Sequence, residues 1–174
     1  MKILKLEIWG MVFISAFGSL LHFAFNWLNR FWLAGAFSAV NESTWEHLKL
    51  AVVAGVVWAV LESKVFKVKA PNFLFAKAIG AYLMPALIVL FFYSYKAILG
   101  HNLLAIDISI FVLAVIIGQI ASYKIMDLPE VSRGLNAVSF ALIAGLFLAF
   151  VVFTFYPPRF FLFLDPVSGG YGIF

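Results

Sequence analysis

The stretch ALIAGLFLAFVVF, residues 141–153, decides the fold class, because it has no charged residue and no alternation of apolar and polar positions. A strand of a membrane β-barrel alternates apolar and polar side chains, whereas a membrane-spanning helix is apolar on all sides. The stretch IFVLAVIIG, residues 110–118, has the same character. Both stretches therefore predict helices that cross a membrane.

The composition of the whole chain indicates the same class. Of its 174 residues, 65% are hydrophobic and 11% are charged, whereas soluble domains are about 45–50% apolar and about 25% charged. A water-soluble globule is excluded. The chain has no cysteine, which excludes disulfides, thiolate metal sites and thiol nucleophiles. Its basic residues are scattered singly, so we expect membrane lipids and no nucleic acid as partners, and the sequence does not identify protein partners.

Apolar runs long enough to cross a membrane occur five times. A helix needs about 20 such residues to span a hydrocarbon core of about 30 Å. The predicted spans are residues 8–29, 43–65, 73–95, 103–123 and 135–156. We therefore expect an all-α integral membrane protein with a five-helix transmembrane domain at residues 1–156 and a short Pro- and Gly-containing interfacial tail at residues 157–174.

The distribution of basic residues predicts the orientation in the cytoplasmic membrane. With five spans, eight of the 12 Lys and Arg residues fall on the side of the N-terminus. Because loops on the cytoplasmic side carry the excess of Lys and Arg, we expect the N-terminus inside and the C-terminus outside.

Polar residues gather toward the outer ends of the first, second and fourth predicted spans. Ionisable residues within a span are costly, so they are paired or functional. If these spans are neighbours, the polar groups converge in one pocket. Its expected members are His22, Asn26, Asn41, Glu42, Glu46, His47 and Asp107.

Imidazole and carboxylate groups together suggest a divalent metal site, for example one that binds zinc. The metal-ligand candidates are His22, His47 and Glu46, and the catalytic candidates are Glu46 and Asp107. A structural alternative exists, because Ser43-x-x-Glu46 also fits a capping box at a helix start. The chain has no H-E-x-x-H motif that would decide between the two.

Two further groups of residues have predicted roles. Glu62 and Lys77 lie at similar depth at the inner ends of consecutive spans, so we expect a structural ion pair between them, with proton coupling as the alternative. The tail could cover the pocket as a lid, with Asp165 and Tyr171 contributing polar groups, or simply lie on the membrane surface.

The segment VNESTWEHLKL, residues 40–50, resembles a family of small bacterial and archaeal multi-pass membrane proteins classed as a domain of unknown function. The resemblance extends over nearly the whole chain and includes LHF around His22, Glu62, AKA around Lys77, DI at Asp107 and the closing DPVSGGYGI. Ala39 departs from the proline expected there. The resemblance implies a shared architecture and no particular activity.

Three functions are compatible with these observations. The first is a metal-dependent intramembrane hydrolase acting on a lipid-like substrate through the outer pocket. The second is a small-solute or proton-coupled carrier, although the apolar middle of the spans offers little to line a polar path. The third is a non-catalytic membrane scaffold in which the polar residues cap and join helices.

Overall fold

A computed structural model describes residues 2–173, which contain five α-helices that are long and apolar enough to cross a membrane. The described residues form no strand, and Leu164 and Tyr171 make one isolated bridge. The predicted all-α class with five spans is confirmed. The long helices are α1 (Lys2–Trp27), α2 (Thr44–Lys64), α3 (Phe73–Leu99), α4 (Leu104–Met126) and α5 (Arg133–Phe155), and the short 3-10 helices are η1 (Trp32–Ala36) and η2 (Phe161–Phe163).

Helices α1 and α3 extend furthest beyond the apolar runs that predict them. Helix α1 begins at Lys2 rather than near residue 8 and so includes Glu7, whose carboxylate is paired inside the bundle. Helix α3 continues past residue 95 to Leu99 and ends at Gly100, whose φ of +78° lies in the left-handed region that glycine tolerates.

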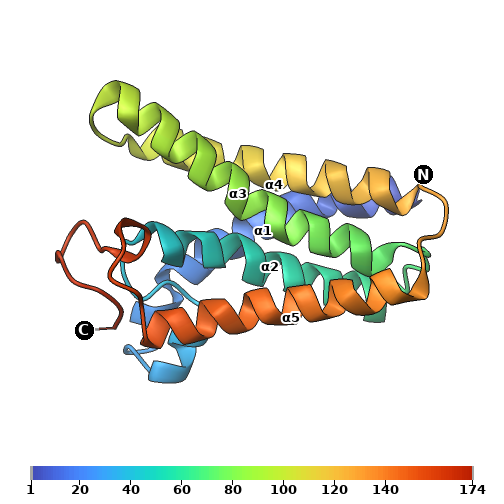
Figure 1. Cartoon of the computed structure of the whole chain (residues 1–174), viewed down its shortest axis with the longest axis horizontal. Coiled ribbons are helices and arrows are strands. Elements are labelled where there is room, and N and C mark those ends of the chain that lie inside the picture. Colours follow the sequence, from blue (N-terminus) through green and yellow to red (C-terminus); the bar gives the residue numbers. More distant parts are fainter. Residues whose placement is uncertain (1, 174) are drawn as a thin grey trace.

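Helices α1, α2, α3 and α4 pack around one another, and α5 lies along α2 and α3 (Figure 1). Helix α2 is the most buried, with Ala51, Val52 and Ala54 fully enclosed. Helix α5 is largely exposed, as expected for a helix that faces lipid. Helix α1 starts at one end of the bundle and the tail lies at the other (Figure 1).

The tail after α5 folds back over the start of α2. The ring of Phe163 lies 4.8 Å from that of Trp45, and Asn41 Nδ2 donates a hydrogen bond to the Gly172 carbonyl at 2.9 Å. The Asp165 carboxylate accepts hydrogen bonds from Val167 N and from Ser168, so it stabilises a turn within the tail itself.

A buried asparagine joins the loops at the end of the bundle opposite the tail. Asn72 is fully buried, and its Nδ2 lies 2.9–3.1 Å from the carbonyl oxygens of Ile125, Leu128 and Pro129. Its Oδ1 accepts a hydrogen bond from Val131 N at 2.8 Å. A single side chain therefore holds the α2–α3 loop against the α4–α5 loop.

We expect Asn72→Ala to lower the free energy of unfolding in detergent by about 2 kcal/mol, because it leaves buried backbone groups without partners. The exposed Asn26 provides a matched control, and Asn26→Ala should change stability by less than about 0.5 kcal/mol. Denaturant titration followed by circular dichroism measures both, and equal stability losses would contradict the role given to Asn72.

Candidate metal site

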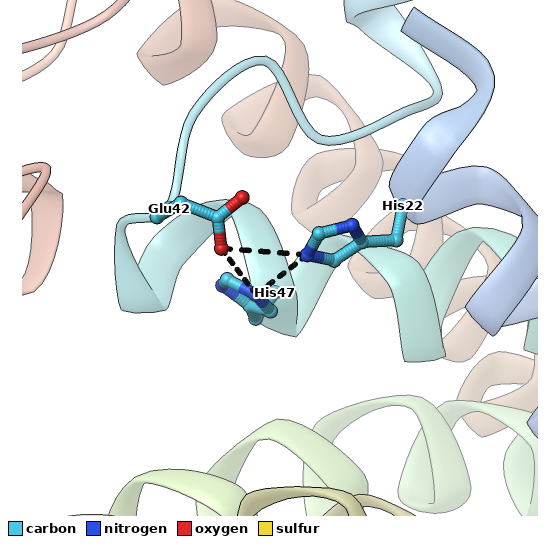
Figure 2. A group of neighbouring side chains, drawn as sticks. All are labelled: His22, Glu42 and His47. Atoms are coloured by element: carbon cyan, nitrogen blue, oxygen red, sulfur yellow. Dashed lines mark hydrogen bonds and ion pairs between the residues drawn. The ribbon is translucent and has the colours of Figure 1, made fainter. Parts of the chain in front are cut away.

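Two histidines and one glutamate from separate parts of the chain meet at the end of the bundle that the tail covers. His22 lies on α1, Glu42 lies in the loop before α2, and His47 lies in the first turn of α2 (Figure 2). The two Nε2 atoms are 3.1 Å apart. Glu42 Oε2 lies 3.4 Å from His22 Nε2 and 3.5 Å from His47 Nε2.

The start of α2 explains how Glu42 and His47 come together. Ser43 is the N-cap, and its Oγ accepts a hydrogen bond from Glu46 N at 3.4 Å. Asn41 Oδ1 accepts one from Ser43 N at 2.9 Å, which tightens the loop just before the cap. Because the chain turns into the helix at this point, a residue before the cap and a residue in the first turn face the same space.

The hydrogen bonding of His47 determines which ring nitrogen is free. His47 Nδ1 lies 2.8 Å from the Ser43 carbonyl oxygen. A carbonyl oxygen can only accept, so in the neutral ring the proton lies on Nδ1 and the lone pair lies on Nε2. The atom directed at His22 and Glu42 is therefore the one that can bind a metal, and the ring is oriented as in many metal-binding histidines.

The spacing of the three atoms fits a tetrahedral metal ion. Zinc binds nitrogen and carboxylate oxygen at about 2.0–2.1 Å, which places neighbouring ligand atoms about 3.3–3.4 Å apart. The observed separations are 3.1, 3.4 and 3.5 Å. These separations are close to that spacing, so His22, His47 and Glu42 could hold such an ion.

The site is charged and can be reached from outside the protein. The side chains of His22, His47 and Glu42 are 27%, 36% and 47% exposed. The hydrogen bond from His22 lowers the pKa of Glu42 below its ordinary value despite the opposing effect of burial, and the imidazoles add to this shift when they are protonated. Glu42 is therefore an anionic ligand at neutral pH.

Glu46 does not join the histidines, contrary to the expectation that it binds the metal with them. Its Oε2 lies 2.6 Å from Lys49 Nζ, and its Oε1 accepts a hydrogen bond from Thr154 Oγ1 at 2.7 Å. Glu46 Oε2 also accepts from Val40 N at 3.2 Å, so its side chain does not complete the expected capping box at Ser43. Adjacent residues on a helix point in different directions, which separates Glu46 from His47.

Asp107 also lies apart from the two histidines. Its carboxylate accepts hydrogen bonds from the Tyr95 hydroxyl and from Asn102 Nδ2, and these contacts join α3, α4 and the loop between them. The expected pocket is therefore smaller than predicted. Asn26 is exposed, and Asn41 anchors the tail through Gly172.

Of the two lid residues, Asp165 lies close enough to Glu42 for its negative charge to oppose the lowering of the Glu42 pKa. Asp165 bonds within its own turn, and Tyr171 pairs with Leu164. The tail is nevertheless held to the loop next to Glu42 by Asn41. The tail therefore fixes the position of the loop that contains Asn41 and Glu42.

At the opposite end of the bundle, Glu62 Oε2 lies 2.5 Å from Lys77 Nζ, so the expected ion pair is present. Glu7 Oε1 lies 2.6 Å from the same Nζ and is a third member that sequence reasoning missed. The available signal was an acidic residue just ahead of an apolar run, which we placed outside the span.

The chain was compared with protein families, curated proteins and solved structures. The model described as "Family of unknown function (DUF6512)" matches residues 1–173. The chain belongs to this family. No curated protein and no solved structure matches the chain. Family membership therefore brings no activity with it, and the function is argued from the site.

Proposed function

We propose that the chain is a metal-dependent membrane hydrolase, with His22, Glu42 and His47 as the zinc ligands. The observation that carries the proposal is the triangle of Nε2, Nε2 and Oε2 atoms with edges of 3.1, 3.4 and 3.5 Å. Two histidines and one glutamate with an open fourth position are a ligand set of catalytic zinc in hydrolases.

The proposed chemistry follows from the open position. A zinc ion held by His22, Glu42 and His47 would lower the pKa of a water molecule to about 7 and would so supply a nucleophile for hydrolysis at neutral pH. The hydrogen bond from His47 Nδ1 to the Ser43 carbonyl holds one ligand in the orientation that binding needs. Glu46 and Asp107 are engaged in other contacts, so the proposal assigns no general base to them.

The surroundings of the site support a lipid-like ester as substrate. His22 lies against Phe23, and Phe23 stacks on Trp27, which is highly exposed near the end of α1. Exposed aromatic residues near a span end are typical of the membrane–water interface. A metal site at that depth meets the carbonyl groups of lipids, where acyl chains join the headgroup.

We propose that this interface is the outer one of the cytoplasmic membrane. Lys and Arg are concentrated on the opposite side of the bundle, where α1 begins, and this excess supports an N-terminus inside. We also propose that the segment at residues 40–50 marks the family in bacteria and archaea, because it contains Glu42 and His47.

The proposal is tested with a p-nitrophenyl acyl ester presented in detergent micelles to the zinc-loaded protein. We expect ester hydrolysis that a chelator stops and that added zinc restores. Mutation of a residue that only orients a metal ligand typically lowers metal affinity or activity by about 10–100-fold. His47→Ala removes a ligand itself, so we expect the rate of ester hydrolysis to fall by at least about 100-fold.

His101→Ala is the matched control, because His101 is an exposed histidine in the α3–α4 loop. This variant should hydrolyse the ester at the wild-type rate. If the zinc-loaded wild type is no faster than His47→Ala, the hydrolase proposal is wrong, whether or not zinc binds.

A further inference from the structure

The buried charges where α1 begins form a second cluster, to which four helices contribute. Lys77 from α3 lies between Glu7 from α1 and Glu62 from α2, at 2.6 and 2.5 Å. Ser122 from α4 donates a hydrogen bond to Glu7 Oε1 at 3.3 Å. Glu7 and Glu62 are fully buried and Lys77 is 7% exposed.

The charges in this cluster do not balance if every group is ionised. Two carboxylates face one ammonium group, which leaves one negative charge inside a membrane bundle. The other lysines at this end of the four helices, Lys2, Lys5, Lys64 and Lys124, are exposed, and none of them pairs with either carboxylate. An unpaired buried charge costs several kcal/mol even after relaxation, so the cluster favours a state that removes it.

The hydrogen bonding of the two carboxylates indicates the same excess of negative charge. Glu7 Oε2 and Glu62 Oε1 are buried, and neither has a hydrogen-bond partner among the described residues. A carboxylate oxygen can carry a proton, and the protonated group is then a donor. The two acids with these unpartnered oxygens, Glu7 and Glu62, both pair with the same ammonium group, that of Lys77.

The polar interior continues one turn further into the bundle. Trp58 Nε1 on α2 and Gln119 Nε2 on α4 are buried donors that have no hydrogen-bond partner within residues 2–173. Both side chains lie against Gly10 of α1, where an added Cβ would come within 2.2 Å of Gln119 and 2.5 Å of Trp58. Because Gly10 is one turn from Glu7 and Trp58 is one turn from Glu62, these donors lie next to the acidic pair along the helices.

We propose that Glu7, Glu62 and Lys77 form a proton-binding site that is separate from the metal site. The pair of acids holds one proton while Lys77 is an ammonium, so the occupied site is neutral. Release of the proton places one uncompensated negative charge at the junction of α1, α2, α3 and α4. The proton content of the site therefore controls the packing of these helices, independently of the proposed hydrolase activity.

Infrared spectroscopy tests the proposal directly, because a protonated carboxylic acid has a carbonyl band separate from that of a carboxylate. We expect wild-type protein near neutral pH to show the band of one buried carboxylic acid. Glu7→Gln and Glu62→Gln should each remove the band, because the remaining acid then forms a balanced ion pair with Lys77. Glu130→Gln, at an exposed loop position, should leave it unchanged.

Lys77→Met provides the opposite test. Without the ammonium group both acids become neutral, and the band should double in intensity. The wild-type spectrum needs no variant, so the proposal stays testable even if one variant fails to fold. The proposal is overturned if folded wild-type protein lacks the band, or if the band persists in Glu7→Gln and also in Glu62→Gln. Zinc binding should be unchanged in Glu7→Gln, which separates this site from the metal site.

Discussion

The purified protein, prepared without an affinity tag, should bind one equivalent of zinc. His22→Ala, His47→Ala and Glu42→Gln should each weaken zinc binding by at least about 100-fold, since each removes one of three protein ligands. The reason is geometric, because two remaining ligands no longer define a face of the tetrahedron. Elemental analysis after dialysis, with competition against a zinc chelator, measures the stoichiometry and the affinity.

The controls for zinc binding come from the same chain. His101→Ala and Glu130→Gln change an exposed histidine and an exposed glutamate elsewhere, and both should retain zinc. Glu46→Gln should also retain zinc, because the Glu46 carboxylate is bonded to Lys49 and Thr154. Zinc loss in Glu46→Gln with zinc retained in Glu42→Gln would show that the wrong carboxylate has been assigned.

Lys49→Met should cause the largest loss of stability, about 3–5 kcal/mol, because it leaves the buried Glu46 carboxylate without a cation. Lys49 is fully buried, with Nζ 2.6 Å from Glu46, 2.8 Å from Thr154 Oγ1 and 2.7 Å from the Gly35 carbonyl. This group joins α2 to η1 and α5. Unfolding in detergent, followed by circular dichroism, measures the change.

The double variant Glu46→Gln with Lys49→Met distinguishes two costs: that of leaving the Glu46 carboxylate buried without a cation, and that of losing the Lys49 side chain itself. It should recover part of the stability, since it no longer contains an unpaired buried charge. Lys96→Met, at the far end of α3, should have little effect. If the double variant is less stable than Lys49→Met alone, the two side chains do not act as the pair described.

The ion pair between Glu62 and Lys77 shows what position along a span can predict. Glu62 and Lys77 lie close to the ends of consecutive spans on the same side, so their approach follows from the span limits alone. Glu7 was missed because its partners, Lys77 and Ser122, are far along the chain. Its burial depends on how α1 packs, and the residues around it in the sequence carry no sign of that.

The candidate metal site shows where sequence reasoning stopped. The two histidines were predicted to share a metal, and their Nε2 atoms are 3.1 Å apart. The third ligand was expected to be Glu46, but Glu42 occupies that position and Glu46 pairs with Lys49. The choice between the two acids depends on the hydrogen bonds that Glu46 makes with Thr154 and Val40, and Thr154 is on another helix.

The sequence by itself determined the membrane class and the number of helices, and it placed the limits of every helix except the start of α1 to within about four residues. These properties are local, because the solvation free energy of each apolar run is set by its own composition and length. The tertiary structure alone decided which carboxylate faces the histidines and which acids share Lys77. Those contacts depend on helix rotation and packing between segments distant in the chain, and many arrangements of the same five spans would satisfy the apolar pattern equally well.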